Sequence, residues 1–304
     1  MCASSVQQSV AKGSTSLAVL SFNVLADCYV RVDGQPWNAF AHVEDAHLVW
    51  ESRVPQILQL LHGSAADVIC LQEVQAEKRE PPGGGPEEWR LPAWTDQLHG
   101  YTGVLQGKKQ KEWDKESERN LRLTGKSSPT GVATFYTTER FEESAASKHG
   151  SGSGTTLFLK CRDSLEPGGV PLEVAVANVH LVGDPSKAAD HIKALHSLKK
   201  NLGRQSLRIV CGDFNGDCKP GTEVADWFAQ EGFAETPTGT SWAEPGNASR
   251  LDHIFATTGL RLIAASGDLS PDEVANGLPC ASCPSDHAPV AACFSGEMRG
   301  RCPW

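Results

Sequence analysis

The residues most able to do chemistry in this chain are the polar side chains that close its strand-like apolar runs. One run ends in "GDFN", with Asp213 and Asn215, and another ends in "ICLQE", with Glu73. The same pattern holds at six further positions: Asn23, Asn178, His180, Asp252, Asp286 and His287. Carboxylates do not gather in segments fit for burial unless a cation or hydrogen bonds satisfy them. The set therefore predicts a polar site where several strands end.

These residue types match the needs of metal-assisted phosphoester hydrolysis. Mg²⁺ prefers hard oxygen ligands, and the carboxylates of Glu73 and Asp286 would supply them, with Mn²⁺ as a possible replacement ion. A carboxylate such as Asp213 can orient or deprotonate the attacking water. The neutral amides of Asn215 and Asn23 would fix its geometry without adding repulsion. We expect these five residues to form the metal and water half of the site.

Two histidines complete the predicted chemistry. A histidine with an aspartate partner becomes a cation that can neutralise charge developing on phosphate, and His287 paired with Asp252 suits that role. His180 offers a second imidazole. Taken singly, each of these residues has an ordinary alternative, because polar side chains also close turns and satisfied histidines occur in strands.

Length and charge limit the classes of function. The chain has 304 residues, of which 39% are hydrophobic and 21% are charged, which is typical of a globular protein with a substantial core. The formal net charge is −9. No basic field covers the whole surface, so a nucleic-acid partner would have to be held by a local patch or through a metal ion.

Cysteine usage and hydropathy indicate an intracellular protein. Ten cysteines sit mostly alone in strand-like runs, which favours free thiols over a disulfide framework. Cys280 and Cys283 form the single CxxC, for which a plain loop and a structural zinc site are the two interpretations. The N-terminus has neither signal-peptide nor transit-peptide character, and no apolar run reaches 18 residues. We expect no membrane span and a cytoplasmic or nuclear location.

Strand and helix patterns alternate along the chain. Strands are predicted at 16–25, 67–74, 131–136, 156–162, 172–181, 207–214, 250–257 and 287–294. Apolar residues at three- and four-residue steps predict helices at 49–63, 185–203 and 221–233. Many strands are apolar on both faces, which indicates sheets covered by helices and hence an α/β layered fold. Residues 79–90 and 106–130 are expected to be loops, the second being either a solvated excursion or a basic flap over a phosphate-bearing substrate.

Seven strings in order resemble the endonuclease/exonuclease/phosphatase superfamily. They are "SFNVLAD", "ICLQEV", "TGVATFY", "NVHL", "GDFN", "RLDHIF" and "SDHAPV". The resemblance implies a four-layer α/β sandwich, with two mixed β-sheets packed face to face and flanked by helices. It also implies one catalytic domain over 17–295 between short tails at 1–16 and 296–304. In that family the site residues hold Mg²⁺, prepare water and contact phosphate, the last role falling to Asn23, Asn178, His180 and His287.

The branch that is most similar contains CCR4, nocturnin, Angel and the 2′-phosphodiesterase. "HLVGDP" resembles the deadenylase pattern in which a proline, here Pro185, helps to sandwich the terminal base. The opposite wall of the base-binding site departs from the deadenylase pattern, because Asn247 stands at the spacing where deadenylases carry a phenylalanine. Trp242 is the available aromatic replacement. The leucine-rich repeats by which CCR4 joins its complex are absent, so that partnership is not expected.

The predicted function is a Mg²⁺-dependent phosphodiesterase acting on RNA as a 3′-to-5′ exoribonuclease of deadenylase type. One alternative is nocturnin-like removal of a phosphate from a small nucleotide, which the acidic charge favours. A second is another phosphoesterase of the superfamily. A third is a non-catalytic scaffold that binds RNA or protein, although buried carboxylates without a metal would only cost stability.

Overall fold

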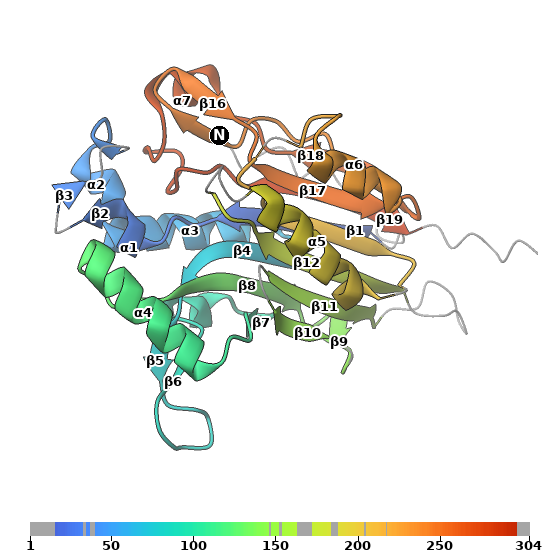
Figure 1. Cartoon of the computed structure of the whole chain (residues 1–304), viewed down its shortest axis with the longest axis horizontal. Helices are drawn as coiled ribbons and strands as arrows, with labels where there is room; N and C mark the ends of the chain where they lie inside the picture. Colours follow the sequence, from blue (N-terminus) through green and yellow to red (C-terminus); the bar gives the residue numbers. More distant parts are fainter. Residues whose placement is uncertain are drawn as a thin grey trace, which may run out of the picture.

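Two β-sheets pack face to face, and helices cover both outer faces (Figure 1). The computed structural model describes residues 16–32, 35–36, 40–145, 147–151, 154–162, 172–183, 188–203, 205–216 and 218–296. The predicted four-layer α/β sandwich is confirmed. The proposed domain limits of 17 and 295 stay predictions, because most of the two tails lies outside the described residues.

Each sheet contains one parallel pair of strands among antiparallel neighbours. The first sheet has the order β18 (Leu260–Ser266), β19 (Val290–Gly296), β1 (Ser16–Asn23), β4 (Val68–Gln75), β8 (Thr130–Thr137), β7 (Tyr101–Leu105). The second has the order β10 (Lys148–Ser151), β11 (Gly154–Cys161), β12 (Glu173–His180), β13 (Arg208–Asp213), β17 (Asp252–Thr257), β14 (Phe233–Glu235), with β9 (Phe141–Glu143) beside β11. The parallel pairs are β1–β4 and β12–β13.

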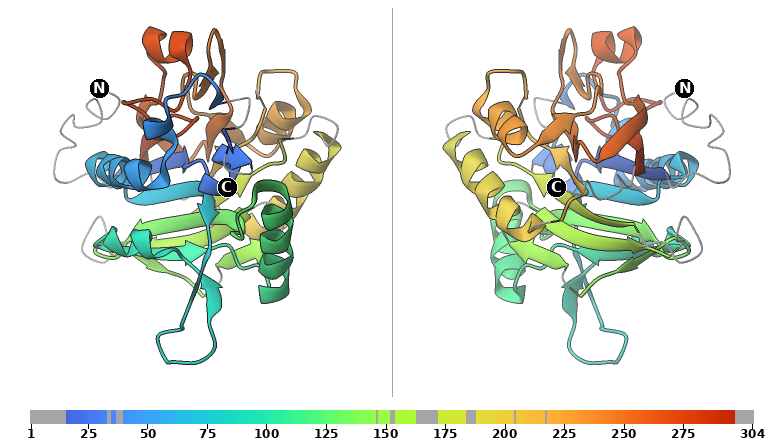
Figure 2. Two further views of the ribbon diagram at one scale, coloured as in Figure 1. Left: turned by 90° about the vertical axis from the view of Figure 1, so that its left-hand side faces the viewer. Right: turned by 90° about the vertical axis from the view of Figure 1, so that its right-hand side faces the viewer.

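Helices bury an apolar stripe against the outer face of each sheet. Helix α3 (Trp50–Ser64) packs Ile57 and Leu61 on the first sheet, whereas α5 (Ala188–Leu202) and α6 (Glu223–Gln230) pack Leu195 and Phe228 on the second. Figure 2 shows α3 and α5 on opposite sides of the stacked sheets. A third core of valine, isoleucine, leucine and phenylalanine fills the space between the sheets.

Short helices and strands lie at the edges of this sandwich. They are α1 (Asp27–Val30), β2 (Arg31–Val32), β3 (Gln35–Pro36), α2 (Asp45–Leu48), the 3₁₀ helix η2 (Ala93–Gln97), β15 (Trp242–Glu244), β16 (Asn247–Ser249) and α7 (Pro271–Asn276). The predicted helices are present, although α3 runs past Gly63 and ends where Ala65 adopts a left-handed conformation.

The two expected loops both contain regular structure. Residues 79–90 belong to a hairpin of β5 (Glu77–Arg79) and β6 (Glu88–Arg90), and residues 106–130 contain helix α4 (Gln110–Thr124). The buried face of α4 consists of Trp113, Ser117, Asn120 and Thr124. Because three of these four side chains are polar, hydrophobic periodicity did not predict the helix.

Among the described residues, no helix is both long and apolar enough to cross a membrane. The eight cysteines described all carry free thiols. Cys280 and Cys283 close a tight turn through reciprocal backbone hydrogen bonds of 2.9 and 3.2 Å. The cellular location stays a prediction.

Candidate active site

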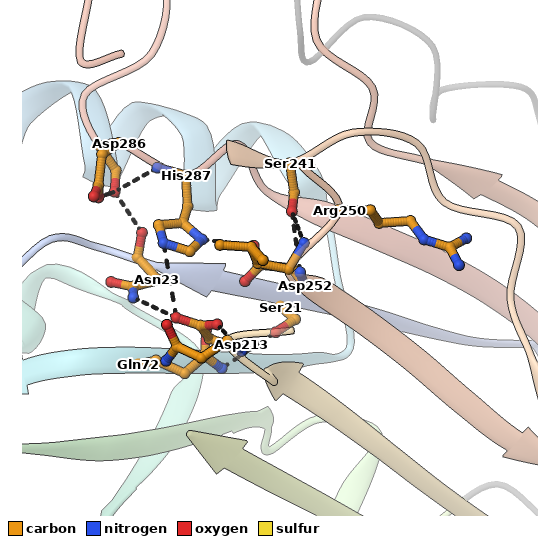
Figure 3. Close-up of polar contacts among 12 residues, drawn as sticks. Ser21, Asn23, Gln72, Asp213, Ser241, Arg250, Asp252, Asp286 and His287 are labelled. Carbon is orange, nitrogen blue, oxygen red and sulfur yellow. Dashed lines mark hydrogen bonds and ion pairs between the residues drawn. The ribbon is translucent and has the colours of Figure 1, made fainter. Parts of the chain in front are cut away.

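The two parallel strand pairs end side by side, and their polar residues meet there. The Asn23 Nδ2 group, at the end of β1, donates hydrogen bonds to Glu73 Oε1 of β4 and to Asp213 Oδ2 of β13, both at 3.0 Å. Figure 3 shows Asn23 and Asp213 facing one another beneath His287. A single buried amide therefore joins acidic residues of the two sheets.

Asp213 lies at the centre of the cluster and is 1% exposed. Its Oδ1 accepts a hydrogen bond from the Asn215 backbone N–H at 2.8 Å. Its Oδ2 lies 3.5 Å from His180 Nε2 and 3.7 Å from His287 Nε2. This carboxylate is thus held in one orientation, with two imidazoles beside it.

The backbone on both sides of Asp213 adopts conformations that few residue types allow. Gly212 has a φ of 149°, and a Cβ at this position would lie 1.9 Å from Val179 O. Asn215 has a φ of 49°, in the left-handed region that asparagine tolerates, and its side chain donates to Leu181 O at 2.8 Å. The "GDFN" turn therefore needs its glycine for close approach to β12 and its asparagine for the turn.

His287 and Asp252 form a buried pair, as the sequence predicted. The His287 Nδ1 to Asp252 Oδ2 distance is 2.6 Å. Burial alone would lower the pKa of His287, but the nearby carboxylates of Asp252, Asp213 and Asp286 raise it well above 6.5. These carboxylates therefore favour the protonated, cationic form of the imidazole. Burial raises the pKa of Asp252 above 3.8, and His287 opposes that rise.

Glu73 and Asp286 form the more open side of the cluster, and both are half-buried. Glu73 has a φ of 59° and lies in a bulge where the β4–β8 register shifts between Leu71 and Val74. Its Oε2 accepts the Ala26 N–H at 2.9 Å. Burial raises the pKa of Asp286 to about 6, with His287 opposing this rise and Glu73 and Asp213 adding to it. Negative charge is in excess on this side.

The donor set fits a divalent cation. Three carboxylates, those of Asp213, Asp252 and Asp286, lie near the His287 imidazole, and Glu73 lies near Asp286. The buried Asp252 Oδ1 has no hydrogen-bond partner among the described residues. Asp213, Asp252 and His287 offer ligand atoms that lie within 4.8 Å of one another, which is consistent with metal binding. This group differs from the predicted ligands Glu73 and Asp286. The short Nδ1–Oδ2 distance between His287 and Asp252 is that of a hydrogen bond, and these two residues form an acid–base pair.

Asn178 is not presented to the site. It is 0% exposed, its Nδ2 donates to Leu71 O at 3.1 Å and Ala133 O at 3.0 Å, and its Oδ1 accepts from Gln72 Nε2 at 2.8 Å. The carboxamide is fully used in tying β12 to β4 and β8. The geometry thus gives Asn178 a positioning role in place of the expected phosphate contact.

The two predicted base-binding residues have different outcomes. Trp242 pairs with His287 in an isolated antiparallel bridge and lines a cavity beside Glu73 and Asp286. Pro185 lies outside the described residues, so its predicted role is unaffected by the structure.

Several supporting residues were missed by the sequence interpretation. Arg53 is 0% exposed, and its Nη1 group donates to Val24 O at 3.0 Å, Leu25 O at 2.9 Å and Pro284 O at 3.2 Å. Burial lowers its pKa to about 10. It clamps the loop after β1 to the loop that carries His287. An arginine four residues before Ile57, on the apolar face of a predicted helix, was the available signal.

Two buried serines also hold the loops of the site together. Ser285 Oγ donates to Asn23 O at 2.6 Å, which ties the loop before His287 to the end of β1. Ser241 Oγ accepts the Asp252 N–H at 3.0 Å (Figure 3). Their sequence signal is weak, because serine is common in loops.

A four-layer sandwich with a buried carboxylate–histidine cluster at its strand ends is consistent with a hydrolase of phosphoester bonds. Residues 20–287 match the sequence model of the Endonuclease/Exonuclease/phosphatase family. The chain belongs to that family.

The relatives named here are all distant. The CCR4-Not complex 3′-5′-exoribonuclease subunit Ccr4 of Candida albicans is 22% identical over 93% of this chain and 41% of its own length. The human nocturnin catalytic domain has a TM-score of 0.61 at 22% identity, covering 93% of this chain and 94% of that one. ANGEL2, a 2′,3′-cyclic phosphatase, has a TM-score of 0.63 at 18% identity, covering 93% and 96%. The chain thus spans less than half the length of its Ccr4 relative, and the structural likeness shows the fold.

Proposed function

We propose that this chain is a Mg²⁺-dependent phosphodiesterase that shortens RNA from its 3′ end. The observation that carries the proposal is the junction of Asn23, Glu73 and Asp213, where one amide holds two carboxylates from different sheets at 3.0 Å. Such a junction places a cation-binding side and a water-activating side within one hydrogen-bond network. The similarity to a 3′-5′-exoribonuclease subunit supports the choice of RNA.

Each residue of the network has a distinct proposed task. Glu73, with Asp286, would hold Mg²⁺, which supplies charge neutralisation at the phosphate when it is bound. Asp213, oriented by Asn215 N–H and Asn23, accepts the proton of the attacking water.

The two histidines act on the phosphate side. His287, kept cationic by Asp252, stabilises negative charge as it develops on the phosphate. His180 Nε2 lies 3.5 Å from Asp213 Oδ2, the same oxygen that His287 approaches, and offers a second imidazole to the phosphate.

The direct test compares three substrates with Mg²⁺ and with EDTA. A 5′-labelled 20-nucleotide RNA ending in adenylates, a mixed-sequence RNA and a 2′-phosphorylated dinucleotide would be incubated with the chain and with Asp213→Asn. We expect a Mg²⁺-dependent ladder that shortens from the 3′ end and is absent in the variant. Survival of both RNAs would contradict the exoribonuclease proposal.

A small nucleotide is the second candidate substrate. Among the described residues that line the cavity beside Glu73 and Asp286, none is a lysine or an arginine, and the formal net charge of the chain is −9. A long RNA gains its affinity from basic side chains along its backbone. Loss of the 2′-phosphate from the dinucleotide, with both RNAs intact, would select this candidate.

A further inference from the structure

A cavity of about 350 Å³ opens directly beside the catalytic cluster. Glu73 and Asp286 form the wall that it shares with the cluster, while Trp242, Tyr29 and Phe40 line it with aromatic rings. This volume lies at the low end of the roughly 300–1,000 Å³ of small-molecule sites. It has room for about one nucleoside next to the phosphate-binding residues.

The aromatic walls are firmly placed. Trp242 is bridged to the backbone of His287, and the Tyr29 hydroxyl is hydrogen-bonded to Thr130 Oγ1 at 3.0 Å. Phe40 is 6% exposed. Planar aromatic side chains favour a planar ligand, because every nucleobase has a π-face that stacks on them.

Glu244 is the carboxylate of this cavity that is left for a base, because Glu73 and Asp286 are the proposed metal ligands. Both oxygens of Glu73 accept hydrogen bonds from within the site, and Ser285 Oγ lies 3.4 Å from Asp286 Oδ1. The Glu244 side chain lines the cavity and makes no hydrogen bond or ion pair with the rest of the described chain. An ionised carboxylate only accepts hydrogen bonds, through two adjacent oxygens.

We propose that this cavity binds a guanine base of the substrate and that Glu244 selects it, an inference that rests on the phosphodiesterase function proposed above. Guanine presents its N1–H and its 2-amino group side by side, so a carboxylate satisfies both donors at once. Adenine and cytosine present one amine beside a ring-nitrogen acceptor, and uracil presents one N–H between two carbonyls. Each of these would leave an acceptor facing Glu244, which costs binding energy.

The test exploits the isosteric variant Glu244→Gln. A carboxamide offers one donor and one acceptor, which match the ring nitrogen and amine of adenine. Binding of 5′-GMP and of 5′-AMP to the full chain would be measured in MgCl₂ by calorimetry and by tryptophan fluorescence. We expect GMP to bind about tenfold more tightly than AMP to the unmodified chain, and the order to reverse in Glu244→Gln.

Two further variants separate recognition from general damage. Glu87→Gln changes an exposed glutamate on the β5–β6 turn, away from the cavity, and should keep the GMP-to-AMP ratio. Trp242→Ala should weaken both nucleotides by a similar factor, because stacking does not distinguish the two purines. Equal affinities for GMP and AMP in the unmodified chain, or an unchanged ratio in Glu244→Gln, would overturn the proposal.

Hydrolysis assays on RNAs ending in guanylate or adenylate then test guanine selection separately from the phosphodiesterase function. Cleavage of both RNAs at the same rate, in the chain and in Glu244→Gln, would overturn guanine selection and leave the phosphodiesterase function standing. Preferential GMP binding without any cleavage would support the base site and contradict the phosphodiesterase function.

Discussion

The two parallel strand pairs, β1–β4 and β12–β13, are built alike and yet deliver their acidic residues in different ways. The strands of both pairs end at the site. In each pair, a helix on the outer face of the sheet connects the two strands. In the second pair, His180 and Asp213 are register partners at the strand ends. In the first pair, the partner of Asn23 is Gln72 and not Glu73.

A bulge explains this difference. Gln72 is buried and hydrogen-bonds Ser21 and Asn178, so the in-register position of β4 serves the contact between the sheets. Glu73 reaches the site through its left-handed backbone, a conformation that costs a non-glycine residue on the order of 1 kcal/mol. The in-register carboxylate of Asp213 is buried and held by hydrogen bonds, whereas the bulged carboxylate of Glu73 stays half-buried in the wall of the cavity. This division supports water activation by Asp213 and cation binding by Glu73.

The largest expected effect is that of Asp213→Asn. The amide cannot take a proton from water, so kcat should fall by a factor on the order of 10² or more. Because the shape is kept, the melting temperature and the Mg²⁺ concentration for half-maximal activity should change little. Steady-state rates across a Mg²⁺ titration check this, and near-normal turnover would refute the assignment.

Glu73→Gln should have a large effect of a different kind. It removes a proposed metal ligand, so kcat at fixed Mg²⁺ should again fall about 10²-fold, but the half-maximal Mg²⁺ concentration should rise about tenfold. Comparison with Asp213→Asn under identical conditions is the matched control. An unchanged Mg²⁺ dependence would break the proposed division between the two strand pairs.

Asp252→Asn should change the pH profile. Carboxylates raise the pKa of His287 well above 6.5, so its ion-pair contribution is present at low pH and is lost as pH rises through that raised pKa. Activity that needs the imidazolium should decline over the same alkaline range. Removal of the Asp252 charge lowers this pKa, so the alkaline limb should move to lower pH and the loss should be smaller at pH 6 than at pH 8. A pH–rate profile of both proteins checks this, and parallel profiles would contradict it.

The smallest effect on activity is expected for Gln72→Met. This change keeps the volume but removes the hydrogen bonds to Ser21 and Asn178, so the free energy of unfolding should fall by about 1–3 kcal/mol. Turnover below the unfolding transition should stay within about threefold. Urea unfolding, together with kcat, measures both quantities. A loss of activity as large as that of Glu73→Gln would place Gln72 in the site itself.

The sequence alone determined the central strands and the polar residues that close them. Long apolar runs form buried strands whatever their neighbours are, and residues such as Asp213 and His287 stand out because they interrupt or end those runs. The pair of His287 and Asp252 was predicted from the chemistry of a histidine with an aspartate partner, together with the resemblance to the family.

Only the tertiary structure decided how those residues are used. The bulge at Glu73, the burial of Asn178 between sheets and the buried clamp of Arg53 depend on partners far away in the sequence. Helix α4 formed on a mostly polar face, because the surrounding chain satisfies side chains such as Asn120, which donates to Ser128 O at 2.7 Å. Contacts of this kind leave no periodic signal, since the groups that satisfy a buried polar side chain are known only once the sheets have packed.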